Sequence, residues 1–331
     1  MTPAAAPVAA GRGLAVGALL RRNTWSLGLL AFLFVLLAFT KLINARYDLT
    51  GIQNLGISIL PLAFATVAQA IVVISGGIDL SLGALMALLS VIAAAMMKGQ
   101  SEQFAVLVVV GVLLLGLVLG GVNGALAVVT RVPDIVVTLA MSFVWGGFAL
   151  LVLVRPGGAS AVWLKDLLAG SLFTEAIPKA AVVLVIVVAA VWIPLAPSRL
   201  GLSIYAIGSN RLAAFRSGVA VGRTRILAYV FAGLFAALGG ISLTATTGIA
   251  TPVPGPYTLN SVAAIVLGGV SLAGGRGGLV GPLIGVIILQ LIRTDMTFLN
   301  MNTNLATVIQ GVILIGVVMI GSLLELRRAR A

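Results

Sequence analysis

Residues 52–97 read IQNLGISILPLAFATVAQAIVVISGGIDLSLGALMALLSVIAAAMM, two apolar stretches separated by a glycine-containing break. The stretches, residues 52–74 and 80–97, approach the roughly 20 residues with which an α-helix crosses a bilayer. Inside a bilayer the backbone must satisfy its own hydrogen bonds, which makes the helix the expected structure. Asp79 is the one charged residue between the two ends. This part of the chain therefore predicts two membrane-embedded helices joined by a break.

Similar apolar stretches recur along the whole chain. With the two above, they cover residues 25–43, 52–74, 80–97, 104–130, 135–154, 180–196, 224–246, 259–273, 279–297 and 305–323. They predict an all-α polytopic membrane protein with about ten transmembrane helices, some broken by Gly-rich segments. The stretch 259–273 is short for an unaided crossing. Eight or nine spans remain open if residues 52–74 and 80–97 form one broken unit.

Composition supports the membrane class and excludes several kinds of site. Of 331 residues, 61% are hydrophobic and 8% are charged, whereas soluble domains carry about 25% charged residues. The absence of cysteine excludes disulfides and thiolate metal sites, and the absence of histidine excludes a Ser-His-Asp triad and histidine-ligated zinc. The net charge of +12 is better explained by basic loops between membrane helices than by nucleic-acid binding.

The distribution of basic residues predicts the topology. With the N-terminus inside, 13 of the 20 basic residues are cytoplasmic and 7 are external, which favours cytoplasmic N- and C-termini. The external residues are Lys41, Arg46, Lys98, Arg155, Lys165, Lys179 and Arg293. Three regions follow: a cytoplasmic tail at 1–24, a transmembrane domain at 25–323 and a cytoplasmic tail at 324–331. Residues 1–24 precede an apolar stretch of transmembrane length, so a retained first helix is expected rather than a cleaved signal peptide.

Two longer connections interrupt the pattern. The connection 155–179 is expected outside, as a short amphipathic helix at the membrane surface. The connection 197–223 is expected inside, and it is the most polar stretch of the chain.

The first candidate site is the break Ser75–Gly83, where Gly76 and Gly77 bend the chain before Asp79 and Ser81. An ionisable residue at membrane depth is costly and usually functional, which makes Asp79 a candidate for the lining of a transport pathway. In the alternative, Asp79 is a helix cap that accepts the free N–H groups of the next helix. The two interpretations are compatible, and both stay open.

The second candidate is residues 268–278, which contain six glycines in eleven residues, beginning with Gly268 and Gly269. Such non-helical backbone is tolerated at membrane depth where protein buries it or where it lines water. Two glycine-interrupted segments in separate halves point to a transport pathway. The alternative is close helix packing through small residues.

The third candidate is the polar segment Gly208–Gly218, which predicts a short cytoplasmic helix around Ala213 and Ala214. Its arginines also fit an electrostatic anchor to anionic lipid headgroups.

The ordered motifs of the chain resemble the monosaccharide-type ABC permeases, from about residue 50 to residue 320. The matching motifs are Gly76-Gly77-Ile78-Asp79-Leu80-Ser81, Asn123-Gly124, Thr138-Leu139, Gly208-Ser209-Asn210 with Ala213-Ala214 and Ser217-Gly218, and Ala263–Gly269 followed by Gly274-Gly275-Arg276-Gly277. The chain departs from the resembled pattern at Arg211 and Asn260, where the family often has acidic residues, and at Asp134-Ile135, where Pro-Phe or a similar pair is usual.

The resemblance implies a non-enzymatic permease subunit in the bacterial inner membrane that imports a sugar-like solute by alternating access. The implied pathway and helix-break residues are Gly76, Gly77, Asp79, Ser81, Asn123, Gly268 and Gly269. The loop 197–223 is then the coupling loop, and the implied ATPase contacts are Gly208, Asn210, Ala213, Ala214, Arg216, Ser217 and Gly218. The implied partners are a second permease chain, cytoplasmic ATPase subunits, a periplasmic solute-binding protein and membrane lipid, without nucleic acid.

ATP and Mg²⁺ are expected in a partner ATPase rather than in this chain. A P-loop requires Gly-Lys followed by Ser or Thr, and none of the four lysines follows a glycine. Two alternatives remain. A permease for branched-chain amino acids or nucleosides would share the architecture. An ion-coupled secondary transporter would need acidic residues within its helices, and of the eight here only Asp79 and Asp295 are expected to lie deep.

Overall fold

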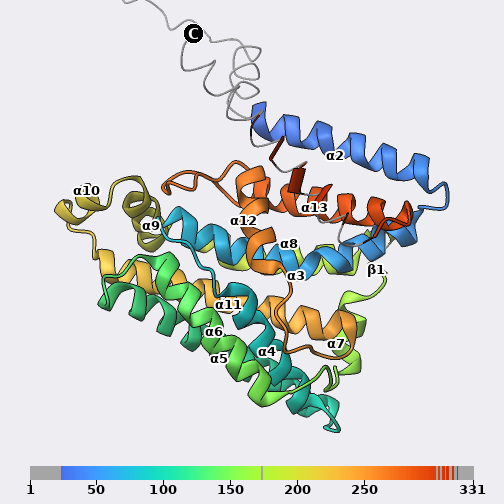
Figure 1. Ribbon diagram of the computed structural model, residues 1–331, viewed down its shortest axis with the longest axis horizontal. Coiled ribbons are helices and arrows are strands. Elements are labelled where there is room, and N and C mark those ends of the chain that lie inside the picture. The colour runs from blue at the N-terminus through green and yellow to red at the C-terminus, as the bar shows by residue number, and fades with distance from the viewer. Residues whose placement is uncertain are drawn as a thin grey trace, which may run out of the picture.

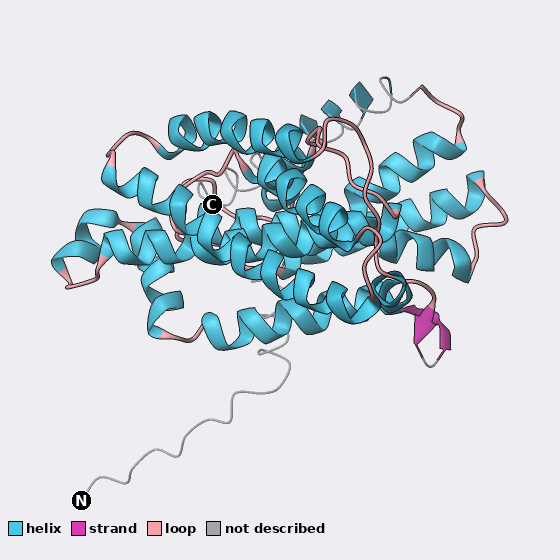
Figure 2. Ribbon diagram, turned by 90° about the horizontal axis from the view of Figure 1, so that it is seen from below, coloured by secondary structure: helices cyan, strands magenta, loops and turns pink. Residues whose placement is uncertain are grey.

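A computed structural model describes residues 24–172 and 174–302, together with isolated positions between 305 and 319. The predicted tails, apart from Thr24, lie outside the described residues, as does much of the predicted helix at 305–323. Apart from one small hairpin, the regular elements in the described residues are helices (Figure 2). The all-helical prediction is therefore confirmed in its main feature.

The described helices follow one another with short connections (Figure 1). They are α2 (Thr24–Ile43), α3 (Leu49–Ile74), α4 (Leu82–Met97), α5 (Glu102–Val129), α6 (Asp134–Val152), α7 (Val162–Leu168), α8 (Lys179–Leu195), α9 (Arg199–Ser209), α10 (Arg211–Arg216), α11 (Val221–Thr247), α12 (Tyr257–Leu267) and α13 (Val280–Phe298). The hairpin pairs β1 (Ser171–Leu172) with β2 (Thr174–Pro178) in an antiparallel register.

Helix α3 forms the centre of the bundle. Its apolar window is 89% buried, and α8, α11, α12 and α13 pack around it. Helix α11 joins α3 to α4 and α5, and it approaches α5 closely because glycines face each other at Gly120 and Gly233. Small residues of this kind allow helix backbones to meet inside a membrane.

Within the described residues, five helices are long and apolar enough to cross a membrane, and a sixth crossing results if the bent pair α8–α9 is one span. The apolar part of α2, Leu27–Ile43, and helices α4 and α12 are shorter. The chain is therefore a multi-pass membrane protein. The count of ten spans and the orientation of the termini stay predictions.

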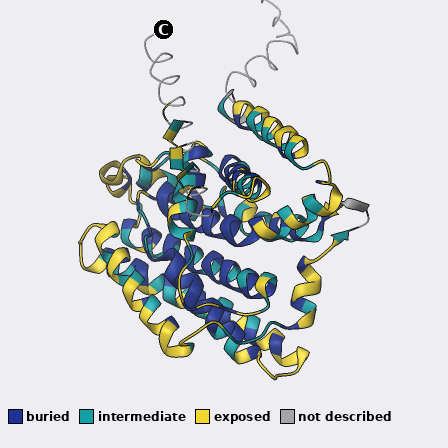
Figure 3. Ribbon diagram, turned by 45° about the vertical axis from the view of Figure 1, so that its right-hand side comes forward, coloured by how far each residue is buried: buried dark blue, intermediate teal, exposed yellow. Residues whose placement is uncertain are grey.

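The outer surface of α5 and α6 is suited to lipid. Large apolar side chains project from it, including Leu107, Val118, Phe143 and Leu151, each at least 60% exposed. Figure 3 shows exposed positions on the outside of the bundle, with the buried residues gathered toward the interior. Apolar side chains that have no protein partner are stable against hydrocarbon, so this face is suited to contact with the bilayer.

Helix α9 was not predicted as a separate helix. It is bent by 81° from α8, and the turn Ala196–Ser198 contains Pro197, which cannot donate a backbone hydrogen bond. Ser198 then caps α9 by accepting from the N–H of Gly201. Helix α12 ends at Leu267 rather than at 273, because Gly268 begins an irregular loop in which Gly269 has φ of +80°.

The bundle has two ends, which we name the α10 end and the α7 end (Figure 1). At the α10 end, the loop 268–279 meets α9. At the α7 end, Gly157 pairs with Ala250, and the carboxylate of Glu102 accepts from the backbone N–H groups of Val162 and Trp163. This carboxylate satisfies free N–H groups at the N-terminus of α7. Helix α7 confirms that the connection 155–179 contains a short helix, and its place outside at the membrane surface stays a prediction.

Candidate functional site

The glycine motifs converge at the α10 end in a cluster that we name the glycine junction, formed by Gly76, Gly208, Gly274 and Gly275. The N–H of Gly275 donates to the carbonyl of Ile74 at 2.9 Å. A Cβ atom on Gly274 would lie 3.0 Å from the Cα of Gly76, and one on Gly208 would overlap the carbonyl oxygen of Ile74. Three segments distant in the sequence thus meet through backbone, as small-residue packing requires.

Asp79 lies in the interior beside the glycine junction, with 2% of its surface exposed. Its carboxylate accepts from the backbone N–H of Ser81 at 2.8 Å and from the Ser81 hydroxyl at 2.6 Å. The side chain of Asp79 thus closes a turn by accepting from the residue two positions later in the chain. The side chain of Ser81, at the N-cap position of α4, makes no capping hydrogen bond. Asp79 therefore holds the entry to α4 without acting as the N-cap residue itself.

The hydrogen bonds continue from Ser81 across the bundle. The Asn123 amide donates to the Ser81 hydroxyl at 2.7 Å, and the Trp145 indole N–H donates to the Asn123 carbonyl oxygen at 3.2 Å. Thr138 accepts from the N–H of Leu80 at 2.9 Å. The predicted residues Asp79, Ser81 and Asn123 are thus brought together in one buried network that spans α4, α5 and α6.

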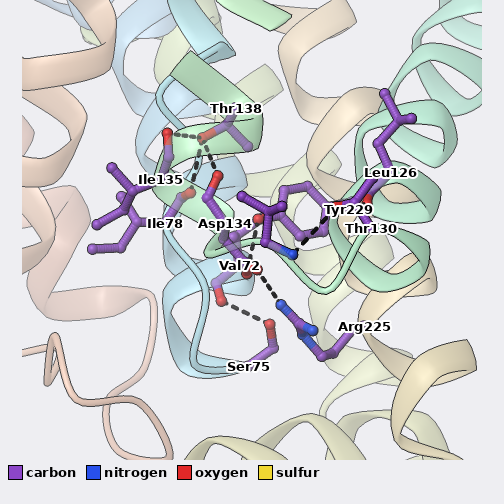
Figure 4. Close-up of polar contacts among 11 residues, drawn as sticks. Val72, Ser75, Ile78, Leu126, Thr130, Asp134, Ile135, Thr138, Arg225 and Tyr229 are labelled. Carbon is purple, nitrogen blue, oxygen red and sulfur yellow. Dashed lines mark hydrogen bonds and ion pairs between the residues drawn. The ribbon is translucent and has the colours of Figure 1, made fainter. Parts of the chain in front are cut away.

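A buried ion pair adjoins this network, and sequence reasoning did not find it (Figure 4). Arg225 of α11 donates to Asp134 at the start of α6, and the Tyr229 hydroxyl donates to the same carboxylate at 3.2 Å. The two charged side chains are only 6% and 11% exposed. The Asp134 carboxylate also leaves no room for a side chain at Gly77, since a Cβ there would meet it. The sequence offered one signal for this ion pair: Asp134-Ile135 stands where the resembled family usually has Pro-Phe or a similar pair.

The predicted coupling segment forms the short helix α10, which projects from the bundle (Figure 1). The side chain of Asn210 caps it by accepting from the N–H of Ala213 at 2.9 Å. Gly218 follows the end of the helix with φ of +83°, as expected for a left-handed cap.

The surface of α10 differs from the predicted set of contact residues. Asn210, Ala213, Arg216, Ser217 and Gly218 are exposed, whereas Ala214 is buried and Gly208 belongs to the glycine junction. The structure adds two apolar residues, Leu212 and Phe215, which are 58% and 67% exposed. An exposed apolar pair flanked by arginines on a projecting helix is typical of a protein-binding surface.

A separate cavity of about 370 Å³ lies in the α7 half of the bundle, between α3, α11, α12 and α13. We name it the polar cavity. It is lined by Asn54, Ile57, Ser58, Pro61, Leu62, Leu243, Thr246, Thr247, Pro256, Tyr257, Asn260, Leu289, Gln290 and Arg293. More than half of these residues carry a hydrogen-bonding side chain. Amides and hydroxyls offer both donors and acceptors, which suits a solute with several hydroxyl groups.

The polar cavity contrasts with the lipid-facing surface of α5 and α6. Asn54 and Ser58 on α3 and Arg293 on α13 are exposed although they lie within membrane-spanning helices. Exposure of such groups to hydrocarbon is costly, so they face water or another protein. Sequence reasoning missed the cavity, because its residues come from four helices and share no local motif. Of the predicted pathway and helix-break residues, none lines it.

A known family covers the same part of the chain. The profile of the family described as a branched-chain amino acid transport system permease component matches residues 51–318. The chain belongs to this permease family. The permease is therefore a component of membrane transport and not an enzyme.

Relatives of the permease extend over most of its length. It is 33% identical to the ribose import permease of Escherichia coli (strain K12), over 78% of this chain and 81% of the relative. The identity to the ribose import permease of Bacillus subtilis (strain 168) is also 33%, over 86% and 88%. The D-allose transport system permease of E. coli (strain K12) is 29% identical, over 76% and 77%. No solved structure matches the permease.

Proposed function

We propose that the permease is the membrane-spanning subunit of an ATP-driven ABC importer that moves a sugar-like solute across the bacterial inner membrane. The observation that carries the proposal is its similarity, over about four fifths of the chain, to ribose import permeases. The polar cavity supports a sugar-like solute, since its amides and hydroxyls match a ring that carries several hydroxyl groups.

The proposed orientation places the α10 end in the cytoplasm and the α7 end outside. The charge bias of the loops supports it. Under this orientation, the polar cavity lies in the external half. The second half of α3 and the glycine junction are buried on the cytoplasmic side of it. The arrangement corresponds to an outward-open form, which receives solute from a periplasmic binding protein.

The proposed coupling runs from α10 into the bundle. Helix α10 docks into a cytoplasmic ATPase through its exposed surface, including Leu212 and Phe215. It lies next to Gly208 of the glycine junction, which contacts the break between α3 and α4 through backbone. Where two segments pack backbone against backbone, a displacement of one is passed to the other, because no side chain lies between them that could rearrange instead. In this proposal, Gly76, Gly77 and Asp79 relay the motion, and the cavity residues contact the solute.

Two permease chains, identical or different, form the pathway together in this proposal, and two ATPase subunits bind ATP and Mg²⁺. The polar surface of α3 and α13 faces the shared pathway, and the apolar surface of α5 and α6 faces lipid.

Co-purification from the native membrane tests the partners. The affinity-tagged permease, extracted in mild detergent, is expected to retain an ABC ATPase, identified by mass spectrometry. The matched control replaces Phe215 and Leu212 by serine, which removes the apolar surface of α10 without touching the bundle. Loss of the ATPase from the control alone supports the proposal, and absence of any ATPase from the unmodified permease contradicts it.

Cysteine labelling tests the orientation, because the chain has no natural cysteine. A cysteine at exposed Ser209 is expected to resist an impermeant external reagent in intact cells, and a cysteine at exposed Gly170 is expected to react. The reverse pattern would place the α10 end outside.

A further inference from the structure

The polar cavity contains one charged side chain, that of Arg293. Its other lining residues are neutral, and no Asp or Glu is among them. Within the described residues, the Arg293 guanidinium has neither an ion pair nor a hydrogen bond to a partner. Arg293 is an exposed cation without a counter-charge on a membrane-spanning helix, and it lines a polar cavity, which makes it a candidate contact for an anionic ligand.

Two other cations on the described helices have polar partners. Arg225 is paired with Asp134, and the Lys41 ammonium donates to the carbonyl oxygens of Ala45 and Tyr47 at 2.8 and 2.7 Å. Asp295, two residues after Arg293, is 1% exposed and does not line the cavity, so it does not neutralise the cavity surface. Arg293 is thus available to a ligand in the cavity.

The polar groups that line the cavity lie at different depths along its axis. Helix α13 runs from the α10 end to the α7 end, so Gln290 lies about one turn deeper than Arg293 on the same face. Tyr257 and Asn260 form a similar pair on α12. The charged group therefore lies toward the α7 end, where hydroxyls and an amide also lie, and Ser58, Asn260 and Gln290 supply polar groups further in.

We propose that the solute is an anionic sugar, specifically a sugar acid whose carboxylate pairs with Arg293 while its hydroxyls bond to the deeper amides. This inference rests on the proposed function. A guanidinium holds a carboxylate through two parallel N–H donors, which a neutral hydroxyl cannot exploit. The volume of about 370 Å³ fits a single monosaccharide with some water rather than an oligosaccharide.

The test uses the complete importer in proteoliposomes, with its own ATPase and binding protein. Uptake of radiolabelled D-glucuronate, D-glucose, D-ribose and glucose 6-phosphate is measured for the unmodified permease, Arg293→Gln and Arg293→Lys. The same binding protein serves all variants, so its selectivity cancels when each variant is compared with the unmodified permease. Lys98→Gln is the matched control, since it removes one charge from the α7 end outside the cavity.

Arg293→Gln is expected to lower D-glucuronate uptake about tenfold or more, as loss of a charge-assisted pair implies, and to change neutral-sugar uptake less than about twofold. Arg293→Lys is expected to retain part of the glucuronate uptake, and Lys98→Gln all of it. Two outcomes overturn this inference but leave the proposed function standing. One is uptake of neutral sugars alone. The other is glucuronate uptake that Arg293→Gln does not change, as expected for an arginine that only reaches lipid headgroups. If glucose 6-phosphate is the only sugar whose uptake depends on Arg293, the ligand group is a phosphate, and the proposal of a carboxylate is overturned. Failure of every sugar to enter with ATP overturns the proposed function itself.

Discussion

The buried pair Arg225–Asp134 allows a quantitative prediction. Replacing Arg225 by Met leaves the Asp134 carboxylate unpaired between α6 and α11, where it is only 11% exposed. An uncompensated buried charge costs about 3–5 kcal/mol, whereas removal of both charges from such a pair is often nearly neutral. We therefore expect Arg225→Met to lower the free energy of unfolding by about 3–5 kcal/mol. The double variant Arg225→Met/Asp134→Leu should lose less than the single variant.

The measurement is reversible unfolding by SDS in mixed micelles, followed by the fluorescence of the four tryptophans. Tyr229→Phe is the control, because it removes one neutral donor to the Asp134 carboxylate and should cost about 1.5–3 kcal/mol, less than Arg225→Met. A loss below about 1 kcal/mol for Arg225→Met would show that the pair is solvated. A double variant that loses the sum of the two single variants would show that the charges do not interact.

Three further predictions concern the other candidate residues. Gly208→Ala places a Cβ atom against the carbonyl of Ile74 and should destabilise the permease by about 1–3 kcal/mol, measured as a lower melting temperature in detergent. An unchanged melting temperature would exclude the tight contact. Asp79→Ala leaves the Ser81 donors unsatisfied and should lower the free energy of unfolding by about 1–3 kcal/mol and remove most of the uptake. Asp79→Asn keeps an acceptor, so a stable Asn variant without uptake would show that the charge itself is needed. Gly218→Val forces a β-branched residue to φ of +83° and should weaken retention of the ATPase while membrane insertion stays normal; full retention and uptake would place the docking site elsewhere.

The sequence predicted the elements that depend on local composition. Apolar length located α3 within three residues of its start and at its exact end, because hydropathy and the bilayer thickness act on each helix separately. The glycine runs marked Gly76 and Gly274 as special backbone, and the structure brings both into one junction with Gly208. That they would meet was not predictable from any one segment, since contact depends on how distant helices pack.

The features that sequence reasoning missed are tertiary. The polar cavity draws Asn54, Asn260 and Gln290 from three helices. Only Asn260 stood out in the sequence, as a departure from the resembled pattern, and nothing local linked it to the other two. Arg225 was counted among the cytoplasmic basic residues, at the start of the predicted helix 224–246, yet it is 5% exposed, because Asp134 supplies the counter-charge. Helix α9 is only eleven residues long and mixes apolar with polar residues, so apolar length did not identify it, and its bend from α8 follows from Pro197.

The most direct test of the account is uptake into proteoliposomes under two energy sources. The permease is reconstituted with its ATPase and binding protein, and radiolabelled sugar is offered on the α7 side. With ATP on the α10 side, accumulation is expected to persist when proton and sodium gradients are collapsed, and to stop when the ATPase is omitted. Accumulation by the permease alone, driven by an ion gradient and indifferent to ATP, would contradict the account and identify a secondary transporter.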